Sequence, residues 1–135
     1  MTKKTISDAP EASRAQNRPA GAEAPTLFLR VKFGERAFLG PGKIQLLELI
    51  EERGSISAAG KAMGMSYRRA WLLIDGLNAV FVSPLVVKQT GGSGGGGAML
   101  TDLGREIVAR YRRIEASAAA QSAADMKALA QVLAP

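Results

Sequence analysis

A glycine run at positions 91–97 limits the folds open to this chain, because six of its seven residues are glycine. The flanking residues favour extended backbone, at positions 85–90 before the run and 98–101 after it. A phosphate-binding loop would need a lysine after the run, and none follows. By itself the run suits either a flexible linker or the tip of a β-hairpin whose backbone can approach phosphates, since glycine has no Cβ.

Two short helical patterns precede this run, with only a tight turn between them. The first opens at positions 55–57, where we expect Ser57 to cap the free N–H groups. Gly64 permits the left-handed backbone that such a turn requires, and Gly60 and Gly64 would let the two helices cross closely. The second pattern runs from Ser66, its expected N-cap, to about position 81. This arrangement is typical of a helix-turn-helix.

The order of the other patterns completes the predicted fold. Apolar and polar residues alternate from Thr26 to Phe33, as in a half-buried strand with which residues 37–39 could pair, and a helix follows at about 43–53. A helix-turn-helix followed by a β-hairpin is a winged helix, and this order favours the hairpin over the linker. The predicted fold class is therefore mainly α with a small β content, a winged helix-turn-helix plus a long C-terminal dimerisation helix.

The charge of the chain indicates a polyanionic partner. Its 135 residues include 18 Lys and Arg against 12 Asp and Glu, a formal net charge of +6. Thirteen basic and eight acidic side chains fall within residues 25–115, so five of the six net charges belong to the predicted domain. Charge alone does not separate nucleic acid from a membrane surface, but no stretch approaches the ~20 apolar residues of a membrane span.

The residue types that the sequence lacks argue against an enzyme. It contains no Cys and no His, which excludes disulfides, thiol nucleophiles, Cys/His zinc sites and histidine acid–base catalysis. We therefore expect no enzymatic activity, no cofactor and no metal site. The N-terminal segment has no apolar central run of the kind found in secretory signals, so we expect a cytoplasmic protein.

The first turn of the predicted recognition helix, about 66–81, is the candidate DNA-contacting segment. Hydroxyls and guanidinium groups at this end suit phosphates and guanine edges in a major groove. The wing at 85–101 would approach phosphates through Lys88 and its glycines. Trp71 would pack against the start of the helix and brace it. An ordinary helical hairpin with two solvated arginines explains the same residues equally well. The candidate DNA-binding residues are Ser57, Ser66, Tyr67, Arg68, Arg69, Trp71, Lys88, Gly92, Ser93 and Gly94.

A long helix is predicted after Thr101, its expected cap. Apolar side chains recur there at intervals of four, four and three residues, and an alanine-rich segment continues to about position 130. At 1.5 Å per residue, a helix from 102 to 130 would be roughly 40 Å long, more than one small domain can cover. We expect a homodimer; the alternative is a helix that ends near Ser117 with a frayed tail. The expected dimerisation residues are Leu103, Ile107, Tyr111 and Ile114.

These patterns predict three segments. Residues 1–25 are Ala/Pro/Ser-rich without apolar periodicity and are expected to be a disordered tail. Residues 26–115 form the predicted winged helix-turn-helix domain, and residues 116–135 form its alanine-rich helical extension.

The motifs in this order resemble the N-terminal DNA-binding domain of ModE-type molybdate-responsive regulators. The likeness covers about 26–115, and the family's wing carries the same Thr-Gly-Gly-x-Gly-Gly-Gly-Gly-Ala run. The resemblance implies a winged helix, a dimer and a palindromic operator near genes for molybdate uptake or molybdoenzymes. The residues that carry it lie at 54–59, 64–71, 77–78, 85–86, 90–98 and 100–101, with Gly104.

The sequence also departs from that family. ModE-type regulators have C-terminal Mop-type molybdate-binding domains with a Ser-Ala-Arg-Asn-type motif, and no such motif occurs in this sequence. We therefore do not expect molybdate binding to transfer to it. The predicted function is a dimeric regulator that binds double-stranded DNA and no membrane. The alternative is a winged-helix interaction module that docks a partner protein through its long C-terminal helix.

Overall fold

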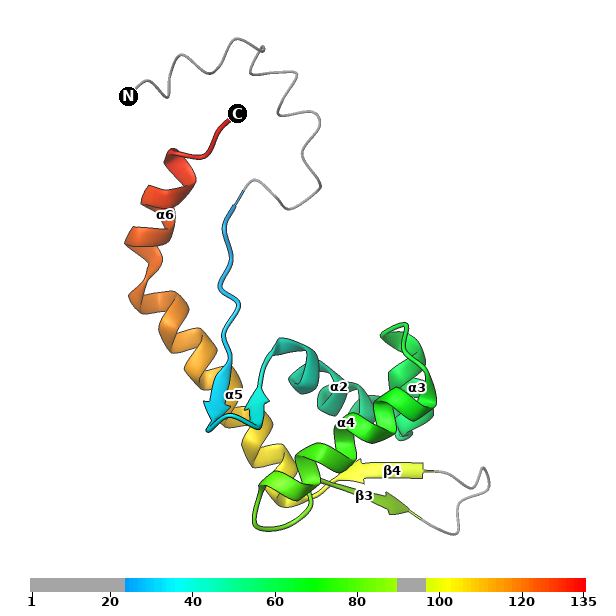
Figure 1. Ribbon diagram of the computed structural model, residues 1–135. Helices are drawn as coiled ribbons and strands as arrows, with labels where there is room; N and C mark the ends of the chain where they lie inside the picture. The colour runs from blue at the N-terminus through cyan, green and yellow to red at the C-terminus, as the bar shows by residue number, and fades with distance from the viewer. Residues whose placement is uncertain (1–23, 90–96) are drawn as a thin grey trace. The chain divides into compact units, whose positions relative to one another are not determined.

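Five helices and two small antiparallel sheets make up residues 24–89 and 97–135, the part of the chain that the computed structural model describes (Figure 1). The chain divides into two compact units, one of Phe28–Ala116 and one that includes Ser117–Pro135. The predicted class, mainly α with a small β content, is confirmed. In order, the elements are β1 (Val31–Phe33), β2 (Ala37–Leu39), α2 (Pro41–Arg53), α3 (Ile56–Ala62), α4 (Tyr67–Val80), β3 (Val86–Gln89), β4 (Gly97–Leu100), α5 (Asp102–Gln121) and α6 (Ala123–Gln131).

The first hairpin is shorter than the alternation of its sequence predicts. β1 pairs antiparallel with β2 from Val31 opposite Leu39 to Phe33 opposite Ala37, and Gly34 in the turn has a φ of 72°. The expected strand from Thr26 is wrong, since β1 begins only at Val31. Strand β2 ends at Leu39, because helix α2 begins two residues later. The residues that precede Val31 therefore have no strand residues opposite them with which to pair.

Helix α2 begins at Pro41, two residues before the predicted start. Proline suits this first helical position, because its missing N–H would have no partner there and its φ already fits a helix. The helix ends at Gly54, which has a φ of 72° and donates its N–H to the carbonyl of Ile50 at 2.8 Å. Its fully buried side chains form one side of the core: Ile44, Leu46, Leu47 and Ile50.

Helices α3 and α4 form the predicted helix-turn-helix. Gly64 between them has a φ of 74°, the left-handed conformation that the turn was expected to require. Gly60 on α3 lies so close to α4 that a Cβ added there would be 2.9 Å from the Cβ of Ala70. The expected cap at Ser57 is wrong, because Ser55 precedes the helix and its hydroxyl accepts the N–H of Ala58 at 3.0 Å.

The second hairpin follows the helix-turn-helix and is the predicted wing. β3 and β4 pair antiparallel from Val86 opposite Leu100 to Gln89 opposite Gly97. Figure 1 shows this hairpin beside α4. The wing is also fastened to the end of α2, because the N–H of Ala98 donates to the carbonyl of Gly54 at 2.9 Å. Residues 91–96 of the predicted glycine tip at 91–97 lie outside the described part of the chain.

Helix α5 begins as predicted and then packs on the core of its own chain. The hydroxyl of Thr101 accepts the N–H of Gly104 at 2.9 Å, which confirms the expected cap. Tyr111 is 1% exposed, and its hydroxyl donates to the carbonyl of Leu29 at 2.8 Å. Leu103 and Ile107 are half-buried against the same core. Tyr111 is thus enclosed by its own domain, and its expected role in dimerisation stays a prediction.

The second unit contains the end of α5 and the short helix α6. The two helices are separated at Ser122, whose hydroxyl donates to the carbonyl of Ala118 at 2.7 Å. Such a bond back to the preceding turn often bends a helix. None of the nine residues of α6 is buried in this chain.

No helix within residues 24–89 and 97–135 combines the length and the apolar character that crossing a membrane needs.

Candidate nucleic-acid interface

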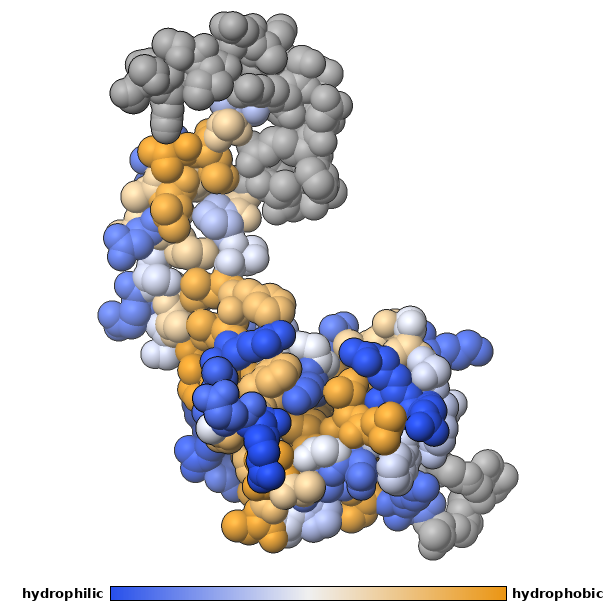
Figure 2. All heavy atoms as spheres, in the orientation of Figure 1, coloured by the Kyte–Doolittle hydropathy of each residue, from blue (hydrophilic) through white to orange (hydrophobic). Residues whose placement is uncertain are grey.

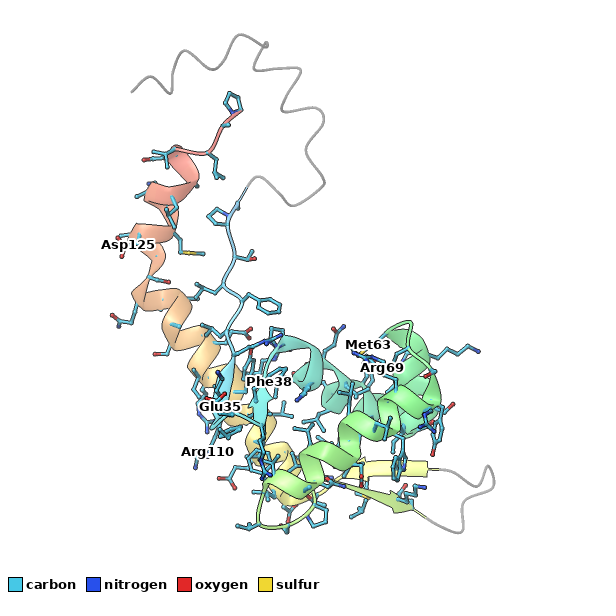
Figure 3. All side chains as sticks on the ribbon, in the orientation of Figure 1. Glu35, Phe38, Met63, Arg69, Arg110 and Asp125 are labelled. Carbon is cyan, nitrogen blue, oxygen red and sulfur yellow. The ribbon has the colours of Figure 1, made fainter. Side chains whose placement is uncertain are left out.

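The first turn of α4 presents polar and cationic side chains to solvent. Ser66 is the N-cap, and its hydroxyl accepts the N–H of Arg69 at 3.1 Å, which confirms the expected cap. Tyr67 is 50% exposed, and Arg68 and Arg69 are exposed beside it (Figure 3, where Arg69 is labelled). The buried side of α4 fixes this orientation, because Ala70, Ile74 and Leu77 pack into the core. The polar first turn consequently faces outward.

Neither of the two arginines at this turn forms an ion pair within the described part of the chain. Within residues 24–89 and 97–135, every salt bridge involves Arg105, Arg110 or Arg112. A surface hollow of about 240 Å³ lies over the turn, lined by Ser66, Arg68, Arg69, Leu72 and Leu73. Guanidinium groups that are exposed and unpaired can donate hydrogen bonds to phosphate oxygens or to the O6 and N7 atoms of guanine.

A second hollow separates α4 from the wing strand β3. It measures about 180 Å³ and brings the predicted Trp71 and Lys88 to the same place. Trp71 is 36% exposed, so its side chain is only partly covered by the domain. Lys88 is exposed on β3. The remaining lining residues are Ile56, Ile74, Asp75, Asn78 and Val86. The structure thus places a cation of the wing, Lys88, beside α4.

Of the other predicted contact residues, the structure describes only Ser57. Ser57 is exposed on the first turn of α3, and this hydroxyl lines neither of the two hollows. Gly92, Ser93 and Gly94 lie outside the described residues, so their part in the predicted interface stays a prediction.

Asn78 is a positioning residue whose role the sequence reasoning missed. Its side-chain oxygen accepts the N–H groups of Leu85 at 2.8 Å and Val86 at 3.3 Å, and its amide donates to the carbonyl of Val86 at 3.3 Å. These three bonds join α4 to the first strand of the wing. A signal existed in the sequence, because an amide on the inward side of an amphipathic helix needs a polar partner when it is half-buried.

Glu51 on α2 holds the other strand of the wing. One of its carboxylate oxygens accepts the N–H of Leu100 on β4 at 3.0 Å, and the other accepts Nε of Arg105 on α5 at 2.7 Å. The Arg105 guanidinium and the Leu100 N–H together hold the pKa of Glu51 below its ordinary value. The wing is thus fixed at both strands, by Asn78 of α4 and by Glu51 of α2.

A second ion-pair group joins α5 to α2. Arg112 donates to both carboxylate oxygens of Glu48, at 2.7 and 3.0 Å, and to Glu115 at 2.7 Å. Its hydrogen bonds to Glu48, followed by the one to Glu115, raise the pKa of Arg112, so this cation is permanently charged and committed to the fold. Among the described residues, Arg112 and two other arginines of α5 form ion pairs with carboxylates, whereas the two arginines in the first turn of α4 form none.

The fold and the exposed first turn of α4 together define a winged helix-turn-helix domain. The surface over α4 mixes hydrophilic and apolar side chains (Figure 2). No family model matches the chain. Curated relatives do match the chain, and their names indicate a more specific group of proteins than the fold alone does.

The molybdenum transport protein ModE of Azotobacter vinelandii is 51% identical over 77 residues, which are 57% of this chain and 28% of that protein. The transcriptional regulator ModE of Yersinia pestis is 41% identical over 85 residues, 63% of this chain and 32% of that protein. The DNA-binding transcriptional dual regulator ModE of Escherichia coli K12 is 40% identical over 85 residues, again 63% and 32%.

This chain therefore carries a domain like the N-terminal domain of ModE regulators. It spans about a third of the length of these curated relatives.

Proposed function

We propose that this protein is a sequence-specific DNA-binding transcriptional regulator whose recognition helix is α4. The observation that carries the proposal is the pair of exposed arginines, Arg68 and Arg69, on the first turn of the second helix of a helix-turn-helix; within residues 24–89 and 97–135 neither has an acidic partner. In helix-turn-helix proteins this turn enters the major groove and contacts base edges. The relatives in Yersinia pestis and Escherichia coli, named as transcriptional regulators, support the same function.

The two hollows beside α4 suggest a division of roles. Arg68, on the outward side of the helix, would contact guanine, since a bidentate bond to O6 and N7 is the commonest specific contact of an arginine. Ser66, Tyr67 and Arg69 would bind nearby phosphates, and Lys88 would reach the backbone from the wing. In this proposal the DNA-binding domain spans about 26–115, and the unit of residues 28–116 supports that boundary.

The proposed active form is a homodimer on a two-fold operator. Apolar side chains of the C-terminal segment are exposed in the single chain: Ile114 (48%), Leu129 (56%), Val132 (78%) and Leu133 (45%). A helix as short as α6 is marginally stable in water by itself, so a covering partner helix would stabilise it. Two recognition helices of a dimer would contact half-sites about one helical turn of DNA apart, ~34 Å.

The relatives also suggest which genes are controlled. Their names refer to molybdenum transport and to transcriptional regulation. We propose operators near molybdenum-related genes. The described residues contain no group of three His, Cys, Asp or Glu side chains placed to hold a metal ion.

In vitro selection of bound DNA from a random library, at several salt concentrations, tests the proposed function. We expect one enriched, two-fold symmetric sequence whose affinity falls as salt rises, because phosphate contacts release counterions. Arg68→Ala should lower the affinity and relax the preference at one base position. Arg110→Ala is the matched control, since this arginine is paired with Glu106 at 2.8 Å on α5, outside the proposed interface.

A second selection in the presence of molybdate tests for an effector of this chain, and we expect the same enriched sequence. Failure to enrich any sequence at any salt concentration would contradict DNA recognition. That result would favour the alternative of a winged-helix module that docks a partner protein through its exposed C-terminal apolar side chains.

A further inference from the structure

The outward face of α4 carries one large apolar side chain among charged and small ones. Arg68, Leu72, Asp75 and Ala79 follow one another at intervals of four, three and four residues, so they share one face of the helix. All four are exposed, and the face opposite them holds the buried Ala70, Ile74 and Leu77. This outward row is the part of α4 that would face base edges in a major groove.

Leu72 is 50% exposed. It lines the 240 Å³ hollow together with Ser66, Arg68, Arg69 and the half-buried Leu73, and it lies one turn beyond Arg68 on the same face. A partly exposed leucine on a protein surface is unremarkable by itself. Here, however, it lies in the outward row next to the exposed guanidinium groups of Arg68 and Arg69, where a bound duplex would cover it.

We propose that Leu72 is a specificity-determining residue that contacts the C5-methyl group of a thymine, an inference that rests on the proposed function. Leucine has no hydrogen-bonding atoms, so the only favourable partner it has in the major groove is the apolar thymine methyl. Cytosine and the purines present polar atoms at the groove floor, and Leu72 would remove water from these without replacing its hydrogen bonds.

The geometry also specifies where this thymine lies. Leu72 is one helical turn, about 5.4 Å, beyond Arg68 along α4. Successive base pairs are separated by about 3.4 Å. The thymine contacted by Leu72 should therefore lie within two base pairs of the guanine contacted by Arg68.

The test replaces each thymine near that guanine by deoxyuridine, which pairs identically but lacks the methyl group. Dissociation constants are measured for the wild type and for Leu72→Ala on the thymine and the deoxyuridine operators. We expect one replacement to weaken wild-type binding about fourfold, the value of one buried methyl group. Leu72→Ala should weaken binding to the thymine operator to a similar or larger extent and should be insensitive to the replacement.

Val80→Ala is the matched control, because Val80 is 38% exposed at the other end of α4 and does not belong to the outward row. It should keep the wild-type sensitivity to deoxyuridine. An unchanged thermal unfolding transition of Leu72→Ala would show that the variant folds, as expected for an exposed side chain.

Additive effects, with Leu72→Ala as sensitive to deoxyuridine as the wild type, would overturn the inference. So would the absence of any sensitive thymine within two base pairs of the guanine. In both cases an enriched operator and an altered preference of Arg68→Ala would leave the proposed function standing. If no operator is enriched at all, the proposed function and this inference fall together.

Discussion

The side-chain oxygen of Asn78 accepts the backbone N–H of Leu85 at 2.8 Å, so the last turns of the recognition helix are joined directly to the residue that precedes the wing. Leu85 itself is fully buried, and Asn78 is half-buried beside the hollow that contains Lys88. This amide side chain thus joins α4 directly to the first strand of the wing, while Glu51 holds the second strand.

Replacing Asn78 should destabilise the domain. Asn78→Ala leaves the N–H groups of Leu85 and Val86 without their acceptor, and an unpaired buried donor costs about 1–3 kcal/mol. Asn78→Asp retains an acceptor for both N–H groups but puts a carboxylate oxygen where the amide donated to the Val86 carbonyl, so it should also destabilise the domain, though less than Asn78→Ala. Urea denaturation of the three proteins measures the difference. Equal stability of the two variants would show that the amide oxygen does not carry this contact.

The close crossing of α3 and α4 predicts opposite effects at two helical glycines. Gly60→Ala places a Cβ 2.9 Å from the Cβ of Ala70 and should lower the free energy of unfolding by about 1–3 kcal/mol. At Gly76 a Cβ would meet no atom within 4 Å, so Gly76→Ala should raise stability by about 0.5–1 kcal/mol through helix propensity. Thermal or urea denaturation checks both, and a stabilising Gly60→Ala would contradict the packing.

The ion pair of Glu51 predicts a pH dependence of stability. Because its pKa is lowered in the folded state, the contribution of Glu51 is present above its ordinary value of 4.5 and is lost as the pH falls through the lower, folded pKa. Glu51→Gln should therefore be less stable than the wild type at pH 7, and the difference should shrink below pH 4.5. Denaturation midpoints from acid to neutral pH test this. A difference that is constant over the whole range would exclude the charged form as its cause.

Tyr111 predicts a second effect at alkaline pH. Tyr111→Phe removes the 2.8 Å bond to the Leu29 carbonyl and should cost about 0.5–1.5 kcal/mol at neutral pH. Burial raises the pKa of Tyr111, so its contribution is complete below the ordinary value of 10.0 and is lost as the pH rises through the folded pKa. The wild type should consequently lose its advantage over Tyr111→Phe in strongly alkaline solution, as followed by chemical denaturation.

Arg68 and Lys88 should affect DNA binding differently. Arg68→Ala should cost about 1–3 kcal/mol on the selected operator and relax the preference at one base position, because a base contact is lost. Lys88→Ala should weaken binding to all sequences alike and reduce the slope of log affinity against log salt by about one, because a phosphate contact is lost. Titrations on specific and random DNA at several salt concentrations separate the two. A base preference altered by Lys88→Ala would reverse the assigned roles.

Local signals in the sequence predicted most of the element order correctly. Gly64 and the caps Ser66 and Thr101 act through their own backbone conformation or through bonds to residues three positions away, so their roles follow from neighbouring residues. The strand at the N-terminal end was overestimated because alternation specifies a half-buried extended segment but not the length of its pairing partner.

The contacts between residues that are distant in the chain were decided by the tertiary structure. Periodicity placed Tyr111 on an apolar face of α5 but not the surface that this face would cover, and the structure directs it to Leu29 of its own domain. Glu51 belongs to the solvent-facing side of α2 in any helical pattern, yet it meets Leu100, which is 49 residues away. The sequence by itself determined which residues share a face; the packing of those faces, which depends on contacts far apart in the chain, determined what each face meets.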